Sequence, residues 1–453
     1  MLAGNDAMGM AGADRVKNDV VTAAAAAGED RQQTLKLRHL PAVAMGNALE
    51  FYDFVTYAFF AVHIGHCFFP SSTPGIGLLE SLATFGVGFL TRPLGGVVIG
   101  RLGDRLGRKP AMLLSFGLMG FSIVGLALTP SAAQIGGAAA VLAVMFRLLQ
   151  GFALGGEVGP ATAFLVEAAP VRWRGLVVSL QSASQNLALL AASLVGFVLT
   201  GLLSAVHLDL YGWRIAFLLG ALVVPMGLWL RRSLPETLHR AAPPHSAPCI
   251  TPSLRRLLVL GSLLLISATV QTYVIAYLTT YALTSLHLAE SLAFAGSVIG
   301  ALCGLVFGPL AAAASDVMGR RRPWLVWPSL ARLACSPLVF WSMVHFHNAA
   351  SFIGGSLVLS ALGSLTPFAL VVIEAIPQRI RSGAFGMMYA VMISAFGGTT
   401  QLAVQGLIEW TKNPLAPAWY LTGALVLGLV AALGFPETAP SVRDIKAGKK
   451  LAF

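Results

Sequence analysis

The chain has 453 residues, of which 56% are hydrophobic and only 11% are Asp, Glu, Lys or Arg. A soluble globular protein carries roughly 25% charged residues, so a surface this poor in charge must face lipid. The composition therefore excludes a soluble enzyme, a disordered protein and a secreted disulfide scaffold. The net charge of +11 would indicate nucleic acid in a soluble protein. Here it indicates basic loops on one side of a membrane.

Residues 1–37 are polar and Ala-rich, without the apolar segment and cleavage site of a signal peptide, and we expect a cytoplasmic tail. From Pro41 onward, apolar stretches of about 20 residues recur, which is the length a helix needs to cross a bilayer. They predict an all-α membrane protein with twelve transmembrane helices. The expected spans are 41–66, 78–100, 110–129, 137–163, 175–203, 213–231, 257–282, 290–314, 324–345, 351–375, 383–409 and 417–435.

Basic residues are distributed unevenly among the connections between these spans. Of the 30 Lys and Arg residues, 25 lie in the two termini and in every second loop, whereas the opposite loops hold only Lys412. Because basic loops stay on the cytoplasmic side, we expect both termini in the cytoplasm of a bacterium, with the chain in its inner membrane. The Pro-rich segment 232–256 is the expected linker between bundles 38–231 and 257–438, and 439–453 is a second tail.

The two halves repeat each other. Asp104 and Arg108 follow the second span and recur after the eighth as Asp316 and Arg320, shifted by 212 positions. Matched charged loops in the same order indicate internal duplication. Such charges can bridge helices in one conformation and release them in the other, or they can serve membrane topology alone. The gating candidates are Asp104, Arg105, Arg108, Asp316, Arg320, Glu167 and Glu374.

Several motifs resemble a known family. GRLGDRLGRK at 100–109 resembles the loop between helices two and three of the major facilitator superfamily, and RLLQG at 147–151 resembles a motif of its proton-coupled members. The resemblance implies two six-helix bundles that are pseudo-symmetric and rock around a central site. Further motifs are similar to the metabolite:H+ symporters, and within that group to citrate and tricarballylate transporters: GNALEFYDF, FLTRPLGG, QSASQ, GWRIAF and RRSLPET.

Charges inside the predicted helices are candidates for coupling, because a charge within the membrane is costly and is usually functional or paired. Glu50 and Asp53 share one face of the first helix. Together with Glu157 they are the expected carriers of the coupling proton. Alternatively, the pair in the first helix neutralises Arg92 or Arg147.

The same two arginines are candidates for binding the substrate. A guanidinium is a planar fork that matches a carboxylate. For Arg147, substrate recognition and a salt bridge both stay open, whereas a structural or gating role is preferred for Arg92. The tyrosines of the seventh helix recur every four residues, a pattern equally typical of packing. The other binding candidates are Gln181, Ser182, Gln185, Tyr273 and Tyr277, with Arg332, Ser394 and Gln401 as secondary candidates from the second half.

These features predict a secondary transporter that imports a small organic anion, a di- or tricarboxylate such as citrate, together with protons. We expect no cofactor, no metal and no nucleic acid, and a monomer embedded in the lipid bilayer. A proton symporter for shikimate or a betaine-like zwitterion is the alternative. A drug exporter is disfavoured, because 175–203 lacks the GxxxGPxxGG pattern. An enzyme is disfavoured, because the chain lacks an HExxH or nucleophile–base constellation.

Overall fold

The computed structural model of the protein describes residues 40–71, 75–106, 108–155, 162, 165–166, 169–221, 252–377 and 380–439. Nearly all of these residues are helical, and none of them lies in a strand. The helices of the first half are α2 (Leu40–Phe59), α3 (Ala61–Phe68), α4 (Ile76–Leu90), α5 (Arg92–Leu106), α6 (Arg108–Leu128), α7 (Ala132–Ile135), α8 (Ala138–Leu154), η1 (Val171–Trp173), α10 (Arg174–Leu202), α11 (Ala205–His207), η2 (Leu208–Gly212) and α12 (Trp213–Ala221).

The second half repeats this all-helical arrangement. Its helices are α14 (Pro252–Thr284), α15 (Glu290–Met318), α16 (Arg322–Phe346), α17 (Ala349–Ser364), α18 (Phe368–Ala375), α19 (Arg381–Met392), η3 (Ile393–Gly397), α20 (Gly398–Thr411) and α21 (Ala416–Gly434). Each of the twelve expected spans coincides with one helix or with consecutive helices, as far as the described residues reach. In that part of the chain, seven helices are long and apolar enough to cross a membrane. The prediction of a helical membrane protein is confirmed.

Two spans are broken near a proline. Within the second span, one helix ends at Leu90 and the next begins at Arg92, directly before Pro93. The tenth span is interrupted between Ser364 and Phe368, where Pro367 lies. Proline has no N–H group and disfavours helical backbone at the residue before it, so each break has a local cause. The first break places Arg92 at the start of a helix inside the membrane.

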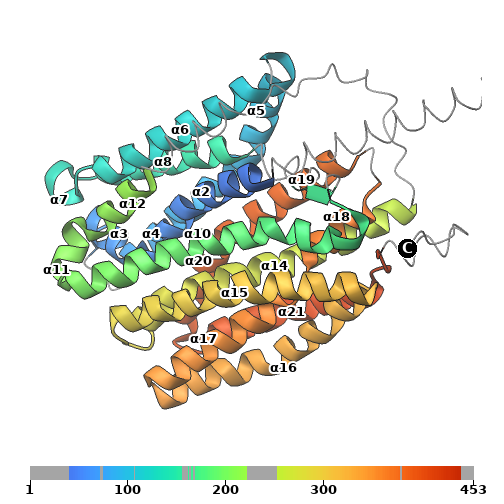
Figure 1. Ribbon diagram of the computed structural model, residues 1–453. Coiled ribbons are helices and arrows are strands. Elements are labelled where there is room, and N and C mark those ends of the chain that lie inside the picture. Colours follow the sequence, from blue (N-terminus) through green and yellow to red (C-terminus); the bar gives the residue numbers. More distant parts are fainter. Residues whose placement is uncertain are drawn as a thin grey trace, which may run out of the picture.

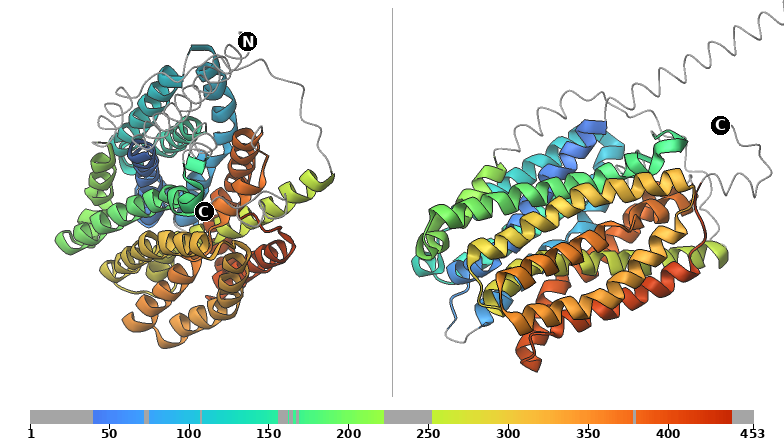
Figure 2. Two further views of the ribbon diagram at one scale, coloured as in Figure 1. Left: turned by 45° about the vertical axis from the view of Figure 1, so that its right-hand side comes forward. Right: turned by 60° about the horizontal axis from the view of Figure 1, so that its bottom comes forward.

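The helices run roughly parallel in two bundles, with the first half above the second in Figure 1. Helix α10 of the first bundle and α15 of the second lie side by side in both figures, and they make the most extensive contact in the described chain (Figures 1 and 2). A second contact joins α4 to α20. There Gly86 permits close approach, because a Cβ on it would overlap the carbonyl oxygen of Gly398. The interface between the bundles is therefore formed mainly by these helices.

The two ends of the molecule differ in charge. One end, at the right of Figure 1, carries Arg174, Arg256 and Arg322 at or near the first turns of α10, α14 and α16. We call it the basic end. The opposite end carries α3, α7 and α11.

Candidate functional site

A close contact between helices brings two buried arginines together in the first bundle. The second span packs against α8 through glycines, and a Cβ on Gly151 or Gly155 would overlap backbone atoms of α4 or of the residue that begins α5. Thr91 also donates a hydrogen bond to a backbone carbonyl of α8 at 2.6 Å. Small residues allow membrane helices to approach in this way. The contact places Arg92 beside the helix that carries Arg147.

Arg147 is completely buried and surrounded by aromatic rings. Its guanidinium carbon lies 4.3 Å from the ring centre of Tyr57, 5.1 Å from that of Phe54 and 5.3 Å from that of Phe85. Nη1 donates a hydrogen bond to Gln150 Oε1 at 2.6 Å, whereas Nε and Nη2 have no hydrogen-bond partner in the described part of the chain. The ring faces stabilise the charge through cation–π contacts, yet two of the donors remain available.

Arg92 and Asp53 complete this buried group, which we call the arginine cluster (Arg92, Arg147 and Asp53). The Arg92 guanidinium lies 4.7 Å from the ring centre of Phe89 and 4.8 Å from that of Phe54, and no described residue accepts a hydrogen bond from its Nε. Asp53 is 1% exposed, and its Oδ1 accepts no hydrogen bond. Its charge interacts with that of Arg147. The cluster therefore contains two positive charges and one negative charge.

A cavity of about 290 Å³ lies between the two bundles. Among the expected binding residues, Ser182 and Gln185 of α10 and Tyr273 of α14 line it. The polar side chains among its described lining residues are Ser, Thr, Asn, Gln and Tyr, and none of these described residues carries a charge. Phe54 and Phe85 also line it, and these are two of the rings that hold the arginine cluster.

Aromatic rings separate the cavity from the arginine cluster. The ring centre of Phe54 lies 4.8 Å from that of Phe85, and the ring centre of Tyr273 lies 6.1 Å from Phe85 and 5.5 Å from Phe89. Phe54, Phe85 and Tyr273 thus belong to the cavity wall, whereas Arg147 does not. In this conformation, the described contacts place these rings between the cavity and the cluster.

Two expected binding residues make contacts elsewhere. The Gln181 side chain accepts a hydrogen bond from Thr162, and its backbone carbonyl accepts one from Asn47 at 3.1 Å. Tyr277 is fully buried and donates to Gln405 Oε1. Neither Gln181 nor Tyr277 lines the cavity. Some of the other expected site residues lie outside the described residues or have side chains that are not described: Glu50, Asp104, Arg105, Arg108, Glu157 and Glu167.

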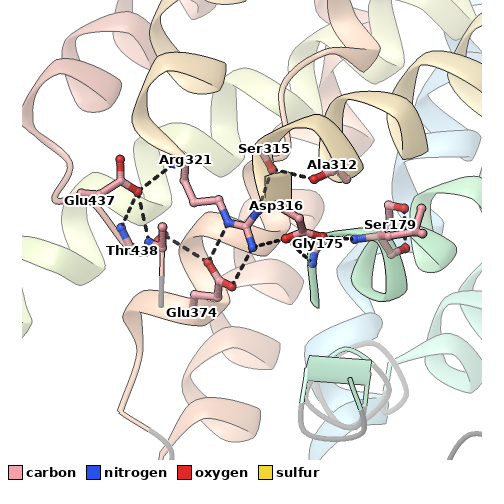
Figure 3. A network of polar contacts seen from close by, with 11 residues as sticks. Gly175, Ser179, Ala312, Ser315, Asp316, Arg321, Glu374, Glu437 and Thr438 are labelled. Atoms are coloured by element: carbon pink, nitrogen blue, oxygen red, sulfur yellow. Dashed lines mark hydrogen bonds and ion pairs between the residues drawn. The ribbon is translucent and has the colours of Figure 1, made fainter. Parts of the chain in front are cut away.

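A polar network joins the two bundles at the basic end (Figure 3). Asp316 of α15 accepts hydrogen bonds from the backbone N–H groups of Gly175 and Leu176, in the first turn of α10, both at 3.0 Å. The same carboxylate pairs with Arg321 Nη2 at 2.6 Å, and Arg321 pairs with Glu374 at 3.3 Å. A carboxylate at the start of a helix is favourable, because the first N–H groups are otherwise unsatisfied. This network connects the halves through charge.

The arginine of this network is Arg321, which the sequence reasoning did not place among the gating residues. Arg320 is exposed, whereas Arg321 is 1% exposed and also donates to Ser315 Oγ at 2.6 Å. Burial favours a lower pKa for Arg321, but Glu374 and Asp316 raise its pKa overall, which keeps it charged. A signal was present in the sequence, since Arg321 repeats the basic residue Lys109.

A second charged group lies at the opposite end, within the first bundle. Asp209 accepts from His63 Nδ1 at 2.5 Å and contacts His66 Nδ1 at 3.2 Å. Burial favours a higher pKa for Asp209, but the hydrogen bonds from the two histidines hold that pKa below its ordinary value. The group fastens α3 to η2, the turn that precedes α12.

The fold and the sequence relate this chain to known proteins. The family described as the Major Facilitator Superfamily matches residues 43–400, and the chain belongs to that superfamily. Its fold also resembles a solved structure of the E. coli xylose transporter XylE, with a TM-score of 0.71 and 17% identity, over 92% of this chain and 99% of that one. The protein is therefore a multi-pass membrane transporter with two pseudo-symmetric six-helix bundles, and it is not an enzyme.

Curated relatives cover most of the chain. The citrate-proton symporter of Klebsiella pneumoniae is 32% identical over 86% of this chain and 89% of its own length. The alpha-ketoglutarate permease of Escherichia coli is 31% identical over 86% of this chain and 91% of its own length. The proline/betaine transporter of Escherichia coli is 30% identical over 92% of this chain and 88% of its own length. These relatives are named for different substrates.

Proposed function

We propose that the protein is a proton-coupled symporter that imports a small organic anion, a di- or tricarboxylate of the citrate type, by alternating access. The arginine cluster is the observation that carries this proposal, because it holds two guanidinium groups against one carboxyl group, and three of the guanidinium nitrogens have no hydrogen-bond partner among the described residues. Buried and unpaired guanidinium donors suit a carboxylate. The relatives named for citrate and alpha-ketoglutarate support this substrate class.

A betaine-like zwitterion is the second candidate, and two observations favour it. A relative is named for proline and betaine, and aromatic faces of the kind that bind quaternary ammonium groups stand in the cavity wall. However, the guanidinium groups of Arg92 and Arg147 already lie over Phe54, and that of Arg147 over Phe85. We favour the anion, because a cationic ligand at these rings would meet two positive charges.

Asp53 is the proposed carrier of the coupling proton. When it is ionised, its negative charge partly compensates Arg147. Protonation removes that charge and leaves more of the positive potential for the substrate anion. Proton and anion would then bind cooperatively, as symport requires. Glu50 and Glu157 stay secondary candidates for the same role.

The test is uptake of radiolabelled citrate into proteoliposomes, with and without an imposed proton gradient. We expect the wild-type protein to accumulate citrate only with the gradient. Asp53→Asn should lose at least about 90% of this accumulation, because a fixed neutral group no longer links the proton to the anion. The variant should retain citrate exchange without a gradient.

Asp209→Asn is the matched control, since it replaces an acid by an amide far from the cluster, and it should accumulate citrate normally. Full gradient-driven accumulation by Asp53→Asn would contradict the coupling role. A wild-type protein that moves betaine but no carboxylate would contradict the substrate class.

We infer an orientation from the loop charges: the basic end faces the cytoplasm of a bacterial inner membrane, and both termini lie there. On this proposal the network around Asp316, Arg321 and Glu374 closes the cytoplasmic side. Asp104, Arg105, Arg108, Arg320 and Glu167 are proposed to assist in the same gate. The transporter is proposed to work as a monomer without a cofactor.

A further inference from the structure

Arg332 of α16 is buried in the second bundle, and no described acidic residue pairs with it. It is 1% exposed, and no described carboxylate lies within 4 Å of it. Nη2 donates to Ser329 Oγ at 2.9 Å, and Nε donates to the Pro328 carbonyl at 3.2 Å. The guanidinium carbon lies 5.1 Å from the ring centre of Phe368. No described carboxylate therefore compensates the charge of this guanidinium.

Gln271 of α14 connects this charge to the cavity. Its Oε1 accepts a hydrogen bond from Arg332 Nη1. Because the guanidinium only donates, the oxygen of the amide faces Arg332 and Nε2 points away from it. Gln271 lines the cavity, as do Phe368 and Gly363. Nε2 lies directly over Gly363, where a Cβ would overlap it, and no described group accepts a hydrogen bond from it. A donor polarised by a buried cation therefore stands in the cavity wall.

We propose that Gln271 and Arg332 form a second anion-binding site, in the bundle opposite the arginine cluster, that binds a second carboxylate of the same substrate. This inference rests on the proposed function. The Gln271 amide would donate directly to the carboxylate, and the Arg332 charge would strengthen that bond through the amide. In this conformation the second site adjoins the cavity, whereas aromatic rings separate Arg92 and Arg147 from it.

Two anion sites in different bundles give a reason for selecting polycarboxylates. A substrate with one carboxylate satisfies one site and leaves the other charge unpaired in a medium of low dielectric constant. A di- or tricarboxylate of sufficient length can satisfy both. It would also attract the two bundles to each other, which favours closure around the substrate.

Gln271→Glu tests the proposal, because it places a permanent carboxylate of nearly the same shape against Arg332. This internal anion should compete with the substrate carboxylate. We expect the Kd for citrate, measured by calorimetry on the purified protein, to rise at least tenfold. The melting temperature without ligand should stay equal or increase, because a buried charge gains a partner.

Gln271→Met is the matched control, since it has a similar length and adds no charge. It should weaken citrate binding less than Gln271→Glu does, because Arg332 keeps its unpaired charge. Arg332→Gln should reduce the affinity for citrate more than that for acetate, which occupies one site only. Equal loss in the Met and Glu variants, or unchanged citrate affinity in Gln271→Glu, would overturn the second site.

The two proposals fail in different ways. If the wild-type protein binds no carboxylate at any pH, the proposed substrate class is wrong and the second site is wrong with it. If the wild-type protein binds citrate and Gln271→Glu binds it equally well, only the second site is wrong.

Discussion

Buried arginines are the residues on which the chemistry of this transporter depends. Placing a charge within the membrane costs several kcal/mol, so an unpaired charge there calls for a compensating role. Arg147 is compensated in part by Asp53 and by three ring faces. Among the described residues, Arg332 has neutral hydrogen-bond partners and one aromatic ring as its contacts. On the proposed function, a substrate anion would supply the missing negative charge in both bundles.

The ion pairs of Asp209 lead to a prediction on how the melting temperature depends on pH. Its pKa is held below its ordinary value by His63 and His66. A lowered pKa in the folded state contributes stability that is present above the unfolded value, near 4, and is lost as the pH falls below it. Asp209→Asn should therefore lower the Tm at pH 7 by about 1–3 °C, as expected for a half-exposed ion pair.

The check is differential scanning fluorimetry of both proteins between pH 7 and pH 3.5. The difference in Tm should shrink below about pH 4, where the Asp209 carboxylate of the unfolded chain begins to be protonated while that of the folded chain stays ionised. A difference that persists unchanged at the lowest pH at which the wild-type protein stays folded would contradict the role of the ionised carboxylate.

Contacts between helices set the positions of the buried arginines. The second span and α8 approach closely because glycines face each other, and the break before Pro93 exposes the Arg92 backbone to Gly155. In water such contacts would be driven by the burial of apolar surface, but in lipid they depend on close packing. The positions of the side chains in the arginine cluster therefore depend on the volume of the uncharged residues at this helix contact.

Gly151→Ala tests this dependence at the scale of the element. The added Cβ would overlap the Gly88 carbonyl oxygen, so the helices must separate or shift. Overpacking of this kind costs about 1–3 kcal/mol, and we expect a lower Tm together with weaker citrate binding. Gly117→Ala is the control, because a Cβ there meets nothing within 4 Å. Equal Tm and equal affinity in the two variants would show that the contact does not position the cluster.

The whole molecule is held in its present conformation by contacts at the interface of the bundles. At the basic end, Asp316 of the second bundle binds the first turn of α10 in the first. On the opening of that end these hydrogen bonds must break, whereas the pair between Arg321 and Glu374 lies within the second bundle and can persist. If the network is the proposed gate, Asp316 is thus the component expected to distinguish the two conformations.

Asp316→Asn should shift the molecule towards the conformation that is open at the basic end. A hydrogen bond to a charged group contributes about 1.5–3 kcal/mol, so the population ratio should change by about tenfold or more. The measurement is the distance distribution between spin labels at Trp173 and Val317, which are exposed in the two bundles, in a background without native cysteines.

Glu437→Gln is the control for this experiment. Glu437 accepts from backbone N–H groups at the start of α16 and from Thr438, all within the second bundle. It should leave the distance distribution unchanged. An unchanged distribution in Asp316→Asn would show that the network does not act as a gate.

The binding candidates show which features of a site a helical sequence pattern can predict and which it cannot. Ser182, Gln185 and Tyr273 line the cavity, while Gln181 and Tyr277 make hydrogen bonds away from it. Neighbouring residues such as 181 and 182 point about 100° apart on a helix. The sequence places such residues on a helix, but the rotation of that helix about its axis depends on its neighbours.

The sequence by itself determined the membrane class, the number and approximate limits of the helices and the duplication of the two halves. These properties depend on local apolarity, chain length and loop charge, which act on each segment separately. Only the tertiary structure decided that Arg321 and not Arg320 binds Asp316, that rings separate the arginine cluster from the cavity, and that Gln271 joins Arg332 to it. Such pairings arise from the packing of helices that are distant in sequence, and no periodicity within one helix specifies them.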